Sequence, residues 1–411
     1  EIPLRLVGSE MCIRDRGSSQ CIRAMLFLAL QGAPQSGKRP VLLAARNAHK
    51  ALLYAAALLD FDIRWLWPSA QAEGALCSCP VTAEALTGAL HAMAQQGNTP
   101  FGVYVTSPDY LGGVQELPAL AAVCRAQGVP LLVDNAHGAY LRFLPQNCHP
   151  IAQGAAMCCD SAHKTLPVVT GGAYLHLAHD APVQDEAAVR GALALFGSTS
   201  PSYLILQSLD ACNAVLAGDY PRRLVQCCAA LEGLRRSLNK TAAARQCPVP
   251  LAVAGAQQEP MKLTLDAAAL GCTGTALADA LRRAQLECEY ADPRYVVLMF
   301  TPENPPQDYT RLQTVLEQLL AAVPAGLLRP ENRAGEFAAL QQQAAQRCTI
   351  RQAVLGAQVR VPVHKALGRV CAMPTVSCPP AIPVAVSGEE ITPAAIVLMQ
   401  RYGIEELSVL R

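Results

Sequence analysis

Short apolar runs alternate with longer stretches of helical periodicity along the first half of the chain. Apolar runs bounded by Gly or Pro are typical of strands buried on both faces. Between them, the spacing predicts helices over Cys21–Leu30, Thr82–Gln95 and Leu117–Gln127. The expected strands are Pro40–Ala45, Ile63–Trp67, Phe101–Thr106, Pro130–Asp134, Ala155–Cys159 and Ala173–Leu177. This alternation predicts an α/β fold with a mostly parallel sheet covered by helices on both faces.

The second half of the chain predicts a smaller α+β portion. Met261–Leu265 and Tyr295–Phe300 have the pattern of strands, and Tyr309–Ala322 has helical periodicity. From Glu336 onward the pattern predicts a helical tail. We therefore expect three domains: a large domain over 17–235, a small α+β domain over 236–330 and a C-terminal domain over 331–411.

The composition indicates a globular protein that acts on small molecules. The chain has 411 residues, of which 52% are hydrophobic and 16% charged, so it can bury a large core. Its formal net charge of +1 provides no basic or acidic field for nucleic acid or a membrane surface. The longest purely apolar stretch, Ala51–Leu59, is far shorter than the roughly 20 residues that span a bilayer.

The 17 cysteines are scattered through apolar runs rather than arranged as a disulfide framework. Because the chain is long and shows no secretory leader, we expect reduced, buried thiols in the cytoplasm. Cys77-Ser78-Cys79 is spaced too closely for the usual CxxC ligand pair, and no second pair follows at zinc-finger spacing. We therefore expect no metal site.

Two residues that follow predicted buried strands carry the candidate chemistry. Asp134 leaves one strand, and Lys164 comes just after the next. A carboxylate beside a ring nitrogen keeps that nitrogen protonated, and a lysine amine can hold an aldehyde as a Schiff base. Taken singly, each residue is more often a turn or surface residue, but together at this place in an α/β sheet they predict a pyridoxal 5'-phosphate (PLP) site.

A phosphate site is expected beside the ring. Gly17-Ser18-Ser19-Gln20 comes immediately before the predicted helix Cys21–Leu30, and the N-terminus of a helix favours anions. Ser18 and Ser19 are therefore phosphate candidates. The alternative is that one of these serines is only the N-cap of the helix.

Five motifs in this order give the chain a family resemblance. It resembles the shorter bacterial ornithine/lysine/arginine decarboxylases, which have the aspartate-aminotransferase-like, PLP-dependent fold. Ser161-Ala162-His163-Lys164-Thr165 downstream of Val133-Asp134-Asn135-Ala136-His137-Gly138 is the most specific part of the resemblance. The other three motifs are Gly17-Ser18-Ser19, Arg46-Asn47-Ala48-His49-Lys50 and Ser198-Thr199-Ser200-Pro201-Ser202-Tyr203.

The resemblance implies a role for each matching residue. Lys164 would form the Schiff base, Asp134 would pair with the ring nitrogen, and His49 would stack on the ring. Ala136 and His137 would line the ring pocket, although His49 and His137 have purely structural alternatives. The residues that would hold the phosphate are Ser18, Ser19, Ser161 and His163. Those that would reach the site of a neighbouring subunit are Thr199 and Ser200.

Three other features bear on the resemblance. Trp65 and Trp67 lie on a predicted strand and are expected to be core residues rather than substrate platforms. Near the C-terminus, Cys378, Ala381 and Ser387 depart from the aromatic-Pro-Pro-Gly-Ile-Pro and Pro-Gly-Glu elements of the family. At the N-terminus, Leu6–Arg16 reads as a translated sequencing adapter, so we expect residues 1–16 to be non-native.

The resemblance implies PLP-dependent decarboxylation of lysine, arginine or ornithine to an amine and carbon dioxide. It also implies a cytoplasmic homodimer or higher homo-oligomer, in polyamine synthesis or acid-stress amine production. Two alternatives remain. One is another PLP reaction, transamination or a lyase step, because the fold does not fix the chemistry. The other is a PLP-binding homologue without catalytic activity.

Overall fold

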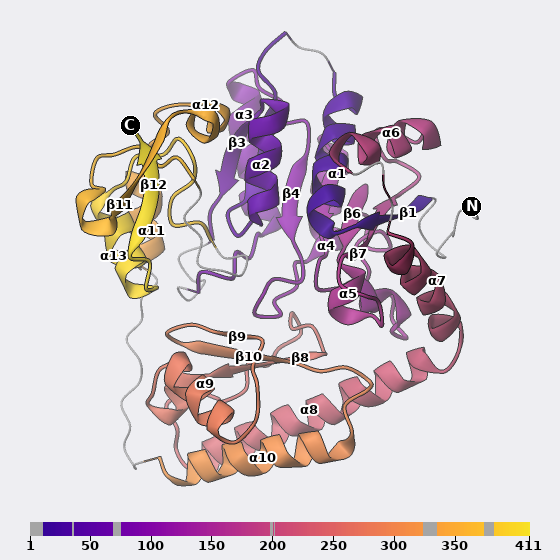
Figure 1. Ribbon diagram of the computed structural model, residues 1–411, viewed down its shortest axis with the longest axis vertical. Coiled ribbons are helices and arrows are strands. Elements are labelled where there is room, and N and C mark those ends of the chain that lie inside the picture. Colours follow the sequence, from indigo (N-terminus) through magenta and orange to yellow (C-terminus); the bar gives the residue numbers. More distant parts are fainter. Residues whose placement is uncertain are drawn as a thin grey trace.

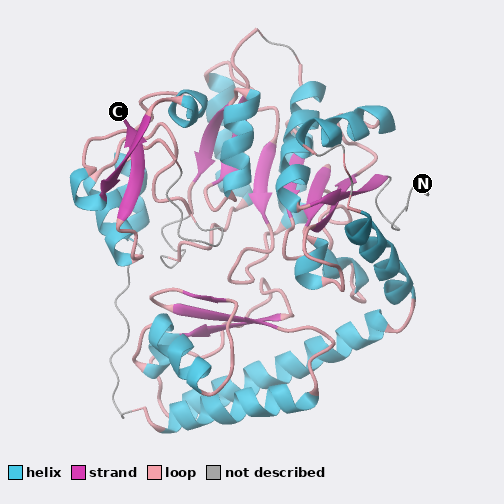
Figure 2. Ribbon diagram, in the orientation of Figure 1, coloured by secondary structure: helices cyan, strands magenta, loops and turns pink. Residues whose placement is uncertain are grey.

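The computed structural model describes residues 11–34, 37–68, 75–197, 200, 202–323, 335–373 and 382–411, with residues 11–16 and 335–337 described as backbone only. A large sheet lies between two layers of helices, and a small sheet packs on long helices below it (Figures 1 and 2). The C-terminal elements lie beside the large sheet, at the left of Figure 1. Among the described residues, no helix is both long and apolar enough to cross a membrane.

The large sheet has seven strands in the order β1-β7-β6-β5-β4-β2-β3. Strands β2 to β6 are parallel, β7 is antiparallel to β6, and β1 is antiparallel to β7. The mostly parallel α/β sheet predicted from the sequence is confirmed, with β1 as an additional edge strand in the segment that was expected to be non-native. The strands are β1 (Met11–Arg16), β2 (Val41–Ala45), β3 (Asp62–Leu66), β4 (Val103–Thr106), β5 (Leu131–Asp134), β6 (Met157–Asp160) and β7 (Gly172–Leu177).

Alternate residues of the central strands pack on opposite helical layers. Val103 and Val133 belong to the core shared with α3 (Ala83–Gln95) and α4 (Leu117–Ala126). Tyr104 and Leu132 belong to the core on the other face. Because side chains alternate across a strand and both faces are covered, the central strands are continuously apolar. The helices of this second face are α1 (Ser18–Gly32), α2 (Lys50–Leu59) and α6 (Glu186–Phe196).

The small sheet is antiparallel, with the order β8-β10-β9, and shares a core with long helices. Its strands are β8 (Lys262–Asp266), β9 (Tyr290–Ala291) and β10 (Tyr295–Met299). The helices of this half are α7 (Tyr203–Ala217), α8 (Tyr220–Ala244), α9 (Gly274–Arg283) and α10 (Pro306–Ala321). Helix α8 runs continuously through residue 235, and the predicted domain boundaries stay predictions.

The C-terminal part is mixed rather than helical, so the predicted helical tail is wrong. Two strands form an antiparallel pair in which Val359 lies opposite Val409 and Val361 opposite Leu407. These apolar residues alternate with polar ones, a period of two that predicts strands. The elements are α11 (Gly335–Gln343), α12 (Ile350–Leu355), β11 (Gln358–Pro362), η3 (Val363–Lys365), α13 (Pro393–Arg401) and β12 (Glu406–Leu410).

A buried ion pair joins the C-terminal part to the large sheet. Arg46, directly after β2, donates from Nη1 and Nη2 to the two carboxylate oxygens of Glu389 at 2.7 and 2.8 Å. The guanidinium lies 4.8 Å from the Trp65 ring centroid and 4.5 Å from that of Trp67. The two half-buried tryptophans therefore flank a charge, in addition to the core packing that was expected.

Glycine is required beside this pair. Gly388 has φ 92°, and a Cβ atom there would lie 2.3 Å from the carbonyl oxygen of Cys348. The departure at Ser387 leaves this glycine in place, whereas Cys378 and Ala381 lie outside the described residues.

We expect Arg46→Met to lower the free energy of unfolding by about 3–5 kcal/mol, because it leaves the Glu389 carboxylate buried without its partner. Arg46→Met combined with Glu389→Gln should recover much of this loss, since Gln keeps an acceptor for the Val386 amide and carries no charge. Glu406→Ala, which removes the exposed Arg360–Glu406 pair, should cost about 0–1 kcal/mol. Urea unfolding followed by circular dichroism measures all three. Equal losses in the single and double variants would contradict the expectation.

Candidate active site

The candidate site lies where neighbouring parallel strands end. Thr106, Asp134 and Asp160 are the last residues of β4, β5 and β6. Lys164 follows β6 in the short helix α5 (Ala162–Thr165), and His137 follows β5. Because parallel strands end at one edge of a sheet, the topology brings these side chains together.

Asp134 is buried, with 2% of its surface exposed, and its carboxylate is held from two sides. The Tyr104 hydroxyl donates to Oδ2 at 3.0 Å, and the Ala136 backbone amide donates to Oδ1 at 3.2 Å. Burial and the Asp134 charge raise the pKa of Tyr104 well above its usual value, so the hydroxyl remains a donor. Sequence reasoning missed Tyr104, whose only signal is a polar tip inside an apolar strand.

Lys164 pairs with a neutral histidine. Its Nζ lies 3.0 Å from Nε2 of His137, which is buried. Burial lowers the pKa of His137 well below its usual value, and the nearby charges of Lys262 and Lys164 lower it further. The imidazole is therefore neutral at pH 7 and can accept a hydrogen bond from the lysine.

A buried lysine on the small sheet also lies close enough to influence this pair. Lys262 on β8 donates to the backbone carbonyl of Asp109 at 2.9 Å, and its Nζ lies 5.3 Å from the Tyr110 ring centroid. The Tyr110 ring meets the His137 ring edge to face at 4.8 Å between centroids. The sequence placed Lys262 inside a predicted strand but gave no signal that its amine contacts the large domain.

His49 begins helix α2. Its Nδ1 accepts a hydrogen bond from the Ala51 backbone amide at 3.2 Å, so the ring proton is on Nε2. Burial lowers the pKa of His49, while the charge of Asp134 raises it and that of Lys164 lowers it, so His49 lies in the field of both residues. The structural alternative is therefore present as a helix cap, and stacking on a cofactor ring stays a prediction.

The predicted phosphate residues gather beside these groups. Helix α1 begins at Ser18 with Gly17, at φ 95°, as its N-cap, so the serines lie in the first turn and neither is the N-cap. The Cys159 thiol donates to the Ser18 carbonyl at 3.4 Å, which ties this helix start to the end of β6. The N–H groups of a first helical turn have no intrahelical acceptors and point outward.

Two hydroxyls and a histidine close to Lys164 in the sequence are further candidates for the phosphate site. Ser161 is fully buried, and its Oγ, like Thr165 Oγ1, has no hydrogen-bond partner among the described residues. His163 donates from Nδ1 to the Gly172 carbonyl at 2.9 Å, which leaves Nε2 as an acceptor in the neutral ring. Unsatisfied buried hydroxyls beside a helix N-terminus fit a phosphate group.

The remaining predicted residues are less informative. Ala136 contributes the backbone amide that binds Asp134, as described above. Thr199 lies outside the described residues, and Ser200 is exposed ahead of α7. Their contribution to a neighbouring subunit stays a prediction.

Residues 16–257 match the protein family described as Orn/Lys/Arg decarboxylase, major domain. The chain belongs to this family. Enzymes of the family use PLP, which confirms the predicted cofactor. The buried carboxylate at Asp134, the Lys164 amine and the unpartnered hydroxyl of Ser161 fit its ring nitrogen, aldehyde and phosphate respectively.

Known proteins agree with this assignment. Over 264 residues, which are 63% of this chain, the sequence is 29% identical to the uncharacterized protein YaaO of Bacillus subtilis. The match covers 52% of YaaO. The arginine decarboxylase of B. subtilis is 27% identical over 84% of the chain and 70% of its own length. The chain thus spans about half the length of YaaO.

Solved structures share the fold. The lysine decarboxylase of Francisella novicida superposes with a TM-score of 0.76 at 17% identity, over 98% of this chain and 70% of that one. The constitutive lysine decarboxylase of Escherichia coli gives a TM-score of 0.72 at 19% identity. Both likenesses confirm the predicted fold class.

The neutral histidines predict a pH dependence of stability. Because burial lowers the pKa of both His137 and His49, the unfolded chain binds more protons below its own histidine pKa of about 6.5. Stability should be fully present above that pH and fall below it, by up to about 1.4 kcal/mol per pH unit for each histidine. His137→Gln should reduce this slope in urea unfolding of the cofactor-free protein between pH 7 and 5. The matched variant of the exposed His91, His91→Gln, should keep the wild-type slope; identical slopes in both variants would contradict the assignment.

Proposed function

We propose that the chain is a PLP-dependent decarboxylase that converts a basic amino acid, lysine, arginine or ornithine, to the corresponding amine and carbon dioxide. The proposal is carried by the position of the Lys164 amine. Its Nζ lies 3.0 Å from the neutral His137 imidazole, and Lys164 follows the strand next to the one that ends at the buried Asp134 carboxylate. Family membership and the arginine decarboxylases among the relatives support the substrate class.

When bound, the cofactor supplies an electron sink for the pair that remains on the substrate Cα as carbon dioxide departs. Asp134 would hold the proton on the ring nitrogen, because an opposite charge at short range favours the charged form. Tyr104 and the Ala136 amide fix that carboxylate from two sides. The carboxylate is thus oriented before any ligand arrives, so little free energy is needed to reorganise it on binding.

Lys164 would hold the cofactor aldehyde, and His137 would hold the Lys164 amine in position. Nε2 of the neutral His137 is within hydrogen-bond distance of Nζ and can accept a hydrogen bond from it. His49, with its proton on Nε2, would cover the ring. The groups proposed to hold the phosphate are the first-turn amides and hydroxyls of Ser18 and Ser19, the Ser161 hydroxyl and the His163 side chain.

A homodimer is part of the proposal. The first two residues of α7, Tyr203 and Leu204, are 79% and 74% exposed in the single chain. Large exposed apolar side chains mark contact surfaces. They follow directly after the segment with Thr199 and Ser200, which supports a subunit contact there and a contribution of these residues to the neighbouring site. The cytoplasm is the proposed location.

Lys164→Ala should lower decarboxylation roughly a thousandfold or more, because it removes the amine proposed to hold the cofactor aldehyde. Asp134→Ala should lose activity and cofactor affinity together. Lys240→Ala removes an exposed lysine of α8 and should match the wild type. Trapped carbon dioxide measures turnover, and borohydride reduction followed by peptide mapping locates the cofactor. Full turnover by Lys164→Ala would exclude the mechanism.

The wild-type protein should release carbon dioxide from one of lysine, arginine and ornithine in preference to the other two. A site that matches the distal polar group of one substrate rejects analogues by several powers of ten. Parallel assays with the three amino acids and product analysis measure this preference. A keto acid in place of the amine would instead identify transamination.

A further inference from the structure

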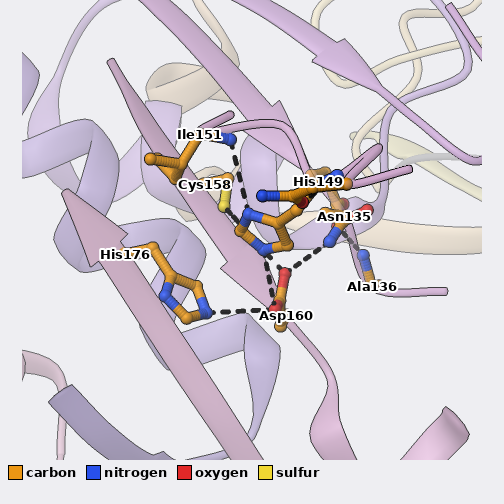
Figure 3. Close-up of polar contacts among 9 residues, drawn as sticks. Asn135, Ala136, His149, Ile151, Cys158, Asp160 and His176 are labelled. Carbon is orange, nitrogen blue, oxygen red and sulfur yellow. Dashed lines mark hydrogen bonds and ion pairs between the residues drawn. The ribbon is translucent and has the colours of Figure 1, made fainter. Parts of the chain in front are cut away.

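A cluster of buried polar groups surrounds Asp160, next to the candidate site, which it contacts through Asn135 (Figure 3). Asp160 ends β6, and its Oδ2 lies 3.1 Å from Nε2 of His149 and 3.0 Å from Nε2 of His176. The Asn135 amide donates from Nδ2 to Oδ1 of the same carboxylate at 2.6 Å. All four residues are at most 4% exposed, although the proposed chemistry uses none of them.

The protons in this cluster can be assigned in part. Nδ1 of His149 accepts a hydrogen bond from the Ile151 backbone amide at 3.4 Å. The ring proton of the neutral imidazole is therefore on Nε2, which donates to Asp160. Burial alone would raise the pKa of Asp160, but its contacts with His149 and His176, whose Nε2 atoms lie within hydrogen-bond distance of Oδ2, outweigh it and lower the pKa. Asp160 is thus an ionised carboxylate that accepts from both imidazoles and from an amide.

The same geometry argues against a metal ion. The ligand atoms of His149, Cys158 and Asp160 all lie within 4.8 Å of one another, which is close enough for one ion. A metal on Nε2 of His149 would move the ring proton to Nδ1, where it would face the Ile151 N–H. Metal-bound histidines normally donate from the second nitrogen to an acceptor. The cluster is therefore better suited to hydrogen bonding than to coordination.

Asn135 connects the cluster to the candidate site. It lies between Asp134 and Ala136, whose amide binds the Asp134 carboxylate. Its backbone amide donates to the Cys159 carbonyl at 2.9 Å, and its side chain donates to Asp160. A Cβ atom at Gly138 would lie 2.0 Å from Asn135 Oδ1, so the glycine makes room for this side-chain position. The backbone amide and the side chain of Asn135 are thus both hydrogen-bonded to the last two residues of β6.

We propose that Asp160 is a positioning residue for the cofactor. Through Asn135 it fixes the turn that holds Asp134 and Ala136, and so sets where the Asp134 carboxylate meets the ring nitrogen. His149 and His176 hold the Asp160 carboxylate in turn. The inference rests on the proposed function, because it assigns to Asp134 the task of binding that nitrogen.

Two single variants test the link without touching Asp134. Asn135→Ala removes the amide donor and leaves the histidine–aspartate contacts in place. Asp160→Asn keeps the shape of the side chain, but its NH2 group must face at least one of the donors from which the carboxylate accepts a hydrogen bond. We expect each variant to bind PLP about tenfold or more weakly in a spectroscopic titration. We also expect each to shift the pH at which the visible band of the lysine-bound cofactor titrates, because Asp134 no longer meets the ring in the same place.

The exchange variant Asn135→Asp with Asp160→Asn tests direction. It reverses the donor and acceptor of the 2.6 Å bond, so it should restore PLP affinity to within about threefold of the wild type. Asn135→Asp alone places two carboxylates together and should not restore it. Cys158→Ala removes the long 4.0 Å contact of the thiol with Asp160 Oδ1 and keeps the bond from Asn135, so it should match the wild type in affinity and spectrum. If Asp160→Asn does not fold, Asn135→Ala and the exchange variant still decide the question.

Wild-type PLP affinity and an unchanged spectrum in Asn135→Ala would overturn the inference. So would a stoichiometric metal ion in the purified wild-type protein that Cys158→Ala loses, because the cluster would then be a metal site. Failure of the wild-type protein to bind PLP would instead refute the proposed function. The two failures are therefore distinguishable in one set of titrations.

Discussion

The bidentate pair between Arg46 and Glu389 is the contact on which the attachment of the C-terminal part to the large sheet depends. It joins residues that are 343 positions apart and buries both charges. A guanidinium taken out of water needs a matched carboxylate and a favourable surface, here Glu389 and two indole rings. Because Arg46 lies between β2 and the loop that carries His49, the C-terminal part fixes the start of this loop. A fragment without Glu389 would leave the Arg46 guanidinium without its carboxylate partner.

The large sheet was predictable because each of its strands is a local pattern. A strand that is buried on both faces must be apolar throughout, so Leu131–Asp134 is visible in the sequence with its terminal carboxylate in place. Lys164 could be found for the same reason, since a short apolar strand ends just before it. Sheet topology then brings the two strand ends together. Local sequence therefore located the two side chains to which the proposed function assigns the chemistry.

The rest of the site depends on contacts that are distant in sequence. Tyr104 reaches Asp134 from a neighbouring strand, and Lys262 reaches Asp109 from the small sheet, 153 residues away. Nothing in the local sequence of either residue indicates its partner. The C-terminal strands were missed for a related reason: β11 and β12 are short and separated by more than forty residues. The alternation of apolar and polar residues covers only five residues in each strand, so the pattern is easily missed without its pairing partner.

The two buried carboxylates at the strand ends differ in what faces them. Four protein groups face Asp160: its two oxygens accept from His149, His176 and Asn135 and, at 4.0 Å, from the Cys158 thiol. An ionised carboxylate offers about four acceptor positions. Among the described residues, Asp134 accepts from Tyr104 and the Ala136 amide, one donor on each oxygen, so acceptor capacity remains for a protonated ring nitrogen. The two carboxylates at adjacent strand ends therefore have different surroundings: protein groups occupy the acceptor positions of Asp160, whereas Asp134 keeps acceptor capacity for a ligand.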